Sequence, residues 1–185
     1  MRQVPAVSSF LIIGRGRVSR HVQRYFELTH APFTTWNRGE SLAELHSRAT
    51  RSSHVLLLIS DSAIDSFARE HAELFAGRQL VHFSGALVSE IVPGAHPLMT
   101  FAGDLYDLET YSHIPFITEK GRGTLAELLP GLANPSHAIE SSLKGLYHAL
   151  CVLSGNFTVL LWEKAFRDFS ERLGLPKEVL LPCLE

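Results

Sequence analysis

The chain has 185 residues, and its 17 lysines and arginines against 19 aspartates and glutamates give a formal charge of −2 at pH 7. This balance argues against a protein held to nucleic acid by a broad basic face. Hydrophobic residues make up 45% and charged residues 19%, so the chain can form a real core and is not of the disordered class.

Cysteine use and the apolar segments bear on where the protein works. Cys151 and Cys183 are too few for a disulfide framework and lack metal-ligand spacing. The first apolar run, residues 10–13, is shorter than the roughly 7 to 15 residues of a signal-peptide core. The most apolar stretch, residues 149–162, is shorter than the roughly 20 residues that span a bilayer. We expect a cytoplasmic protein with no membrane segment and, because its ten histidines are scattered, no metal site.

Up to about residue 118, short apolar runs alternate with helical patterns. Strands are expected at residues 10–13, 32–36, 55–59, 80–83, 98–101 and 116–118. Helices are expected around residues 18–26, from Ser41 onward and over 63–75, and Ser41 with Glu44 matches a capping box. This alternation predicts an α/β fold with a doubly wound parallel sheet.

From Gly121 onward the strand signals stop. A short helix is expected at about residues 124–129, and one long helical pattern runs from Ile139 to about Leu173, where Gly174 would end it. The predicted organisation is an α/β domain over residues 1–119 and a small all-helical domain over residues 120–185. Because the tail is apolar nearly all round, we expect it to pack on the first domain and on a second copy in a homodimer.

The turn between the first predicted strand and the first predicted helix reads GRGRVS over residues 14–19. Gly14 would allow a tight turn, and the missing side chain of Gly16 would let a pyrophosphate approach the helix N-terminus. A preceding strand and a following amphipathic helix are the context of a dinucleotide-binding fingerprint. Ser19 stands where a third small residue is usual, and a simple tight turn is the alternative interpretation.

At the end of the second predicted strand the chain reads Trp36-Asn37-Arg38-Gly39. An NAD site would carry a carboxylate near here for the ribose 2′-hydroxyl. Arg38 can instead pair with a 2′-phosphate, and Asn37 can donate a further hydrogen bond. The sequence therefore favours NADP over NAD, with a polar turn closed by Glu40 as the alternative.

Residues that follow the third and fourth strands would reach the same edge of the sheet. Ser60 and Asp61 follow the third strand, although Asp61 is as well suited to capping the next helix. The expected cofactor-binding residues are therefore Gly14, Arg15, Gly16, Arg17, Val18, Asn37, Arg38, Ser60 and Asp61. Ser84 and Gly85 follow the fourth strand.

Four further polar residues are candidates for contact with a substrate. Pro97 biases His96 toward extended geometry, and the imidazole could protonate a carbonyl oxygen as hydride arrives, or be an ordinary turn histidine. Lys144 and His148 share a helix face, although a solvated lysine is the commoner outcome. Asn156 is polar within an apolar run and needs a partner if buried.

Together these motifs resemble the 6-phosphogluconate dehydrogenase-like superfamily. More narrowly, they resemble bacterial proteins that join a Rossmann-like domain to a helical C-terminal domain of unknown function. The resemblance implies a Rossmann-like dinucleotide-binding domain, a helical substrate and dimerisation domain, and a Ser84-Gly85 stretch near the substrate. It also implies a catalytic histidine at His96-Pro97, as in prephenate dehydrogenases, and a catalytic lysine at Lys144. The asparagine that closely follows this lysine in hydroxyacid dehydrogenases is absent.

The expected function is that of an NADP-dependent oxidoreductase that transfers hydride to or from a small carbonyl or hydroxyl compound. The expected catalytic residues are His96, Ser84 and Lys144, and the expected substrate-binding residues are Gly85, His148 and Asn156. The absent asparagine keeps a non-catalytic dinucleotide-binding sensor or regulatory module as the alternative. A structural dimerisation protein with a vacant nucleotide fold ranks third.

Overall fold

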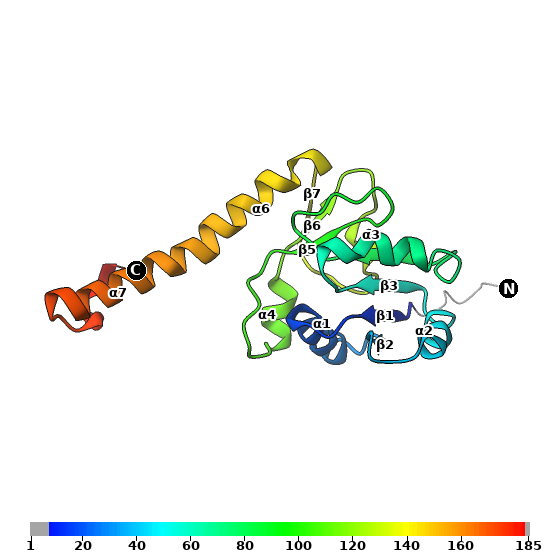
Figure 1. Ribbon diagram of the computed structural model, residues 1–185, viewed down its shortest axis with the longest axis horizontal. Coiled ribbons are helices and arrows are strands. Elements are labelled where there is room, and N and C mark those ends of the chain that lie inside the picture. The colour runs from blue at the N-terminus through cyan, green and yellow to red at the C-terminus, as the bar shows by residue number, and fades with distance from the viewer. Residues whose placement is uncertain (1–7, 184–185) are drawn as a thin grey trace. The chain divides into compact units, whose positions relative to one another are not determined.

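The computed structural model describes residues 8–183, and the chain falls into two compact units that divide after Gly145 (Figure 1). The first unit contains a parallel four-stranded sheet of order β2-β1-β3-β4. Its strands are β1 (Phe10–Ile13), β2 (Phe33–Trp36), β3 (His54–Leu57) and β4 (Gln79–His82). The helices between them are α1 (Arg17–Leu28), α2 (Leu42–Ala49) and α3 (Asp61–Glu70).

Both faces of this sheet are covered, which explains why its central strands are apolar without interruption. Phe10 and Ile12 of β1 pack in a cluster with Phe26 of α1. Leu11 of β1 packs in a second cluster with Leu45 of α2 and with α3. The capping box predicted at Ser41 is present at the start of α2. The doubly wound arrangement predicted from the sequence is confirmed here.

A second, three-stranded sheet has the order β5-β6-β7. Its strands are β5 (Ala95–Pro97), β6 (Phe116–Glu119) and β7 (Ser136–Ile139), and the short helices α4 (Leu108–His113) and α5 (Leu125–Leu128) lie between them in sequence. β5 pairs antiparallel with β6, whereas β7 pairs parallel with it. A parallel bridge from His82 to Gly94 links β4 to the start of β5.

Two predictions for this region are wrong. A strand was expected at residues 98–101, but the observed strand, β5, lies just before them at Ala95–Pro97. Phe101 is buried because it packs in an aromatic cluster with Tyr25 and Tyr111. Strands do not stop at Gly121, because β7 follows; three of its four side chains are exposed, so it has no apolar alternation that would predict a strand. The compact unit that contains both sheets extends to Gly145.

The second unit is helical, as predicted. α6 (Lys144–Val152) continues through a π-helical segment (Leu153–Phe157) into α7 (Thr158–Leu173), and a 3₁₀ segment (Lys177–Cys183) follows. Gly174 has φ +66°, and this left-handed residue ends α7 as expected. Gly155 lies in the π-helical segment.

Large apolar side chains are exposed along this unit. They are Leu146, Leu150, Leu153, Phe157, Val159, Leu160, Leu161, Leu173, Leu175, Val179 and Leu181. Contrary to the expectation from the 14-residue stretch, the helical run Ser141–Leu173 is long and apolar enough to cross a membrane by length and composition alone. None of its most apolar window is buried. These two properties are shared by helices that pack on a partner, so they are weak evidence for a membrane.

Candidate functional site

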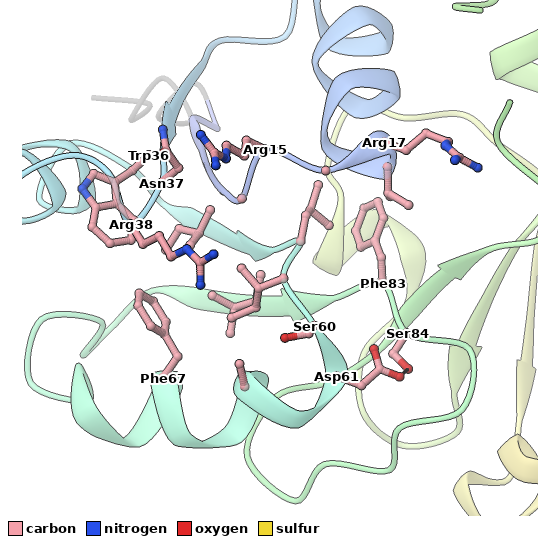
Figure 2. A pocket seen from close by; sticks show the side chains of 18 residues that line it. Arg15, Arg17, Trp36, Asn37, Arg38, Ser60, Asp61, Phe67, Phe83 and Ser84 are labelled. Carbon is pink, nitrogen blue, oxygen red and sulfur yellow. Dashed lines mark hydrogen bonds between the residues drawn. The ribbon is translucent and has the colours of Figure 1, made fainter. Parts of the chain in front are cut away.

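A pocket of about 640 Å³ lies at the carboxyl ends of β1, β2 and β3 (Figure 2). This volume falls in the range of ligand pockets, roughly 300 to 1,000 Å³. The structure brings every predicted cofactor-binding residue to its lining: Gly14, Arg15, Gly16, Arg17, Val18, Asn37, Arg38, Ser60 and Asp61. Ser84 lines it as well.

Gly14 is required by the packing of the protein itself. Its φ is +127°, and a Cβ built on it would lie 2.2 Å from the carbonyl oxygen of Leu58. Its N–H donates to the carbonyl of Trp36 at 2.9 Å. Only glycine fits a backbone that crosses the neighbouring strand this closely.

Gly16 is different, because the packing of the protein does not explain it. Its φ is −72°, it is the N-cap of α1, and a Cβ on it would meet nothing within 4 Å. No side chain caps the helix there, and its first turn contains no acidic residue. The N–H groups and the positive dipole end of this 12-residue helix therefore face the pocket without a carboxylate to neutralise them.

Ser19, the departure from the usual fingerprint, supports the same turn. This buried hydroxyl donates to the carbonyl of Gly14 at 2.8 Å and accepts from Gln23 Nε2 at 2.9 Å. The extra oxygen is thus hydrogen-bonded and does not hold the helix away from the sheet.

Three arginines line the pocket, and they do not behave alike. Arg17 donates to the carbonyl of Phe101 at 3.2 Å, and Figure 2 shows its guanidinium pointing away from that of Arg38. Arg15 and Arg38 are exposed, and neither forms a hydrogen bond or ion pair with any residue between 8 and 183. Two guanidinium groups are therefore available for an anion.

The side chain of Asn37 is committed to a local turn. Its Nδ2 donates to Glu40 Oε1 at 2.9 Å, and its Oδ1 accepts the N–H of Gly39 at 3.0 Å. Glu40 also pairs with Arg48 at 2.6 Å, and this hydrogen bond holds the pKa of the carboxyl below its usual value. The polar-turn alternative therefore describes Asn37 and Glu40, whereas Arg38 stays open.

Ser84 and Asp61 form one hydrogen-bonded unit at the rim of the pocket. Ser84 Oγ donates to Asp61 Oδ2 at 2.6 Å and accepts the N–H groups of Ala86 at 3.2 Å and Leu87 at 2.9 Å. A hydroxyl has one donor and two acceptor sites, so its hydrogen-bonding capacity is filled. Asp61 lies in the first turn of α3 and does not cap it, since Ser60 is the N-cap residue.

The same arrangement recurs one helical turn further along α3. Ser89 Oγ donates to Asp65 Oδ1 at 2.5 Å and accepts from the N–H groups of Ile91 and Val92 at 3.2 Å and 2.9 Å. Arg122 donates to the backbone carbonyls of Ser89 and Glu90. The segment that leads from β4 to β5 is therefore fastened at two points on α3.

The other predicted functional residues do not line this pocket. Lys144 is 3% exposed and its Nζ lies 2.6 Å from Glu119 Oε1, so it is buried in an ion pair and not presented to a substrate. His96 lies in β5, opposite Ile117 of β6, and Gly85 is buried. His148 and Asn156 belong to the second unit, where Asn156 is exposed and not buried as the apolar pattern suggested.

Sequence reasoning missed a buried polar cluster that Glu119 and His82 form with Lys144. His82 is fully buried, and its Nε2 lies 3.9 Å from Glu119 Oε1. His82 Nδ1 accepts the N–H of Ser84 at 3.1 Å. The one available sequence signal was a carboxylate, Glu119, at the end of an otherwise uncharged strand.

No family model and no curated protein matches the chain. Solved structures do share its fold. A candidate NADP oxidoreductase from Bacteroides fragilis is 19% identical, with a TM-score of 0.66 over 96% of this chain and 77% of that one. A reductive aminase from Aspergillus terreus in complex with NADPH and ethyl levulinate is 16% identical, with a TM-score of 0.65 over 97% of this chain and 71% of that one. An imine reductase variant from Myxococcus stipitatus in complex with NAD⁺ is 21% identical, with a TM-score of 0.62 over 92% of this chain and 68% of that one. The chain has the Rossmann-like fold of these proteins, as the resemblance implied.

Proposed function

We propose that this chain is an oxidoreductase that binds a nicotinamide dinucleotide in the pocket of its first unit. Its substrate would be a small carbonyl or hydroxyl compound. The observation that carries the proposal is Gly16, a glycine that packing does not require, at an uncapped helix end beside two arginines that have no partner within residues 8–183. The bound dinucleotide would supply or accept a hydride. That proteins of this fold bind NADPH or NAD⁺ supports the assignment.

The proposed cofactor is NADP, with NAD second. Glu40, the acidic residue that follows β2, already binds Arg48 and Asn37, so it is not free to hold a ribose 2′-hydroxyl. Arg38 has no partner among residues 8–183 and lines the pocket, so its planar guanidinium can receive a 2′-phosphate. Arg15 and the N-terminus of α1 would hold the diphosphate.

Titration of the purified protein with NADPH and NADH, followed by nicotinamide fluorescence, tests this assignment. Arg38→Ala should weaken NADPH binding by about 10- to 100-fold, since a charged hydrogen bond is lost, and should leave NADH binding unchanged. Arg24→Ala is the control, because Arg24 lies on α1, pairs with Glu27 and does not line the pocket formed by the described residues. Equal NADPH affinity in the Arg38 variant would refute the 2′-phosphate assignment. A wild-type protein that binds neither dinucleotide would refute the proposed function.

A dinucleotide sensor without turnover is the second candidate. It is favoured by the pocket lining, where Asp61 is the only carboxylate and is hydrogen-bonded to Ser84. Among residues 8–183, no histidine or lysine contributes to the lining. A proton donor would then have to come from outside the pocket, and His96 of the first unit is the proposed source.

Turnover separates the two candidates. The NADPH-loaded protein is incubated with panels of small ketones, aldehydes and imines, and oxidation is followed by absorbance. Turnover that His96→Ala lowers at least tenfold, with NADPH affinity intact, supports the enzyme and identifies the donor. Tight binding without oxidation across the panel favours the sensor.

We also propose that the second unit mediates a homodimer. Leu150, Phe157 and Leu161 are each about half exposed or more, and helices with apolar side chains on this scale need a covering surface. Light scattering should give a dimer of the 20.5 kDa chain, and Leu150→Glu combined with Leu161→Glu should give a monomer. A stable wild-type monomer would refute the dimer. If the wild-type protein co-sediments with lipid vesicles and the double variant does not, the apolar face of the second unit binds a membrane surface.

A further inference from the structure

The buried cluster of His82, Glu119 and Lys144 has no part in the function proposed above. His82 ends β4, Glu119 ends β6 and Lys144 begins α6, and all three are at most 3% exposed. Gly94 packs among them, since a Cβ there would lie 2.8 Å from Lys144 Nζ and 2.9 Å from both Glu119 Oε1 and His82 Cε1. Three secondary-structure elements and one glycine are therefore arranged around a single carboxylate.

The hydrogen bonds of His82 define its protonation. The N–H of Ser84 donates to His82 Nδ1 at 3.1 Å, and a backbone N–H can only donate. Nδ1 must therefore carry no proton, and the neutral ring carries its hydrogen on Nε2. A doubly protonated ring would lose the bond to Ser84, the residue whose hydroxyl closes the turn to Leu87 at the pocket rim.

Glu119 works against this neutral state. A carboxylate 3.9 Å from a buried imidazole favours the imidazolium, because the two charges attract in a medium of low polarity. Lys144 lies closer to the same carboxylate, at 2.6 Å, and Arg122 Nε lies 3.6 Å from its other oxygen. Lys144 hydrogen-bonds one oxygen of the carboxylate, and Arg122 adds positive charge near the other, so the charge of Glu119 is balanced without a charged histidine. Among the described residues, Glu119 Oε2 and His82 Nε2 have no hydrogen-bond partner.

The other charged and titratable groups that face His82 are Asp65 and His96, and the net effect favours the neutral ring. Burial contributes most, followed by Lys144 and then Arg122, and together they lower the pKa of His82 to about 3. Asp65 acts weakly in the opposite direction, and His96 acts weakly in the same direction.

We propose that Lys144 is a positioning residue: as the counter-ion of Glu119 it leaves His82 uncharged, so that the ring accepts the N–H of Ser84 and fixes the turn at the pocket rim. The lysine acts at a distance, through Glu119 and His82, and touches no ligand. The interactions among Lys144, Glu119 and His82 are a property of the protein alone. Only the claim that the turn matters for binding a dinucleotide rests on the proposed function.

The test is made on Lys144→Met, on the double variant Lys144→Met/Glu119→Gln, and on Lys120→Met. Lys120 is exposed and pairs with Glu140, so its substitution is a control for loss of a neighbouring charge. Imidazole ¹⁵N shifts report the tautomer and titration of His82, and hydrogen exchange at pH 5 reports protection of the Ser84 amide. Neither measurement needs a dinucleotide.

In Lys144→Met, the pKa of His82 should rise measurably above its wild-type value of about 3, because a repelling cation is lost and the carboxylate is freed. Exchange at the Ser84 amide should become at least tenfold faster at pH 5. The double variant should return both quantities toward wild type, because it removes the charge that Lys144 balances. Lys120→Met should change neither.

An unchanged tautomer and unchanged Ser84 exchange in a folded Lys144→Met protein would overturn the proposal. So would a double variant that keeps the altered histidine, since simple loss of packing would explain that result. If Lys144→Met does not fold but the double variant does, with neutral His82, the proposal is supported. A failure of the wild type to bind NADPH would refute the dinucleotide site and leave these outcomes unaffected.

Discussion

Gly14 and the carbonyl of Leu58 lie so close that no side chain can be added between them. A Cβ on Gly14 would lie 2.2 Å from Leu58 O, and the residue has φ +127°. Gly14→Ala should therefore lower the free energy of unfolding by roughly 2 to 4 kcal/mol, from the clash and the strained backbone together. Urea denaturation measures this. Gly77→Ala, at φ +75° with open space around the Cβ, is the control for backbone strain alone and should cost less.

Gly16 should respond in the opposite way. Gly16→Ser places a capping hydroxyl at the N-cap of α1, where a Cβ meets nothing within 4 Å. The free energy of unfolding should change by less than about 0.5 kcal/mol, because serine and glycine differ little at this position. The side chain should nevertheless occupy the space of an approaching phosphate and weaken NADPH binding at least tenfold. An affinity equal to that of wild type would show that the phosphates do not approach this helix end.

The residues that line the pocket could be predicted from sequence because they lie in one local motif and at the ends of neighbouring parallel strands. β1, the turn and α1 are consecutive, so the strand, the glycines and the cap appear in one stretch of about 20 residues. The ends of β2 and β3 reach the same edge because parallel strands point the same way. Local pattern and one topological rule were sufficient for nine lining residues.

The second sheet and the buried cluster could not be predicted by that reasoning. β7 is an edge strand with three exposed side chains, so its strand character comes from pairing with β6 and not from apolar alternation. His82, Glu119 and Lys144 are separated by 37 and then 25 residues in sequence, and no spacing rule relates them. Lys144 was expected at a substrate site because of its place on a helix, and the ion pair with Glu119 depends on a contact that only the folded chain provides.

Ser84 and Ser89 make equivalent hydrogen bonds, and this predicts a structural role for both. Ser89→Ala should cost about 1 to 3 kcal/mol, because it leaves the buried N–H of Val92 without a partner and removes the short hydrogen bond to Asp65, whose carboxylate then has Arg69 at 3.9 Å. Ser84→Ala should cost less, since that residue is half-buried and water can replace the hydroxyl. Chemical denaturation of the two variants gives both values.

A double-mutant cycle checks the pairing. Ser89→Ala and Asp65→Ala should not be additive, because each removes the same hydrogen bond. If Ser84→Ala left stability unchanged but abolished turnover of a substrate found later, the serine would act on the substrate and its filled hydrogen bonds would not define its role.

Glu40 should titrate abnormally, because Arg48 binds its carboxylate. The hydrogen bond from Arg48 lowers the pKa of Glu40 most, and the N–H of Asn37 adds to the effect. A carboxyl whose folded pKa is depressed contributes stability above its unfolded pKa, and that contribution is lost as the pH falls through the folded value. Side-chain ¹³C shifts followed between pH 2 and 7 should therefore place the midpoint of Glu40 below its usual range. Arg48→Met should raise this midpoint toward the ordinary value and leave Glu127 unaffected, since the pKa of Glu127 is lowered by the N–H and hydroxyl of Thr124 instead. Equal midpoints of Glu40 in wild type and variant would show that Arg48 does not hold the turn beside Arg38.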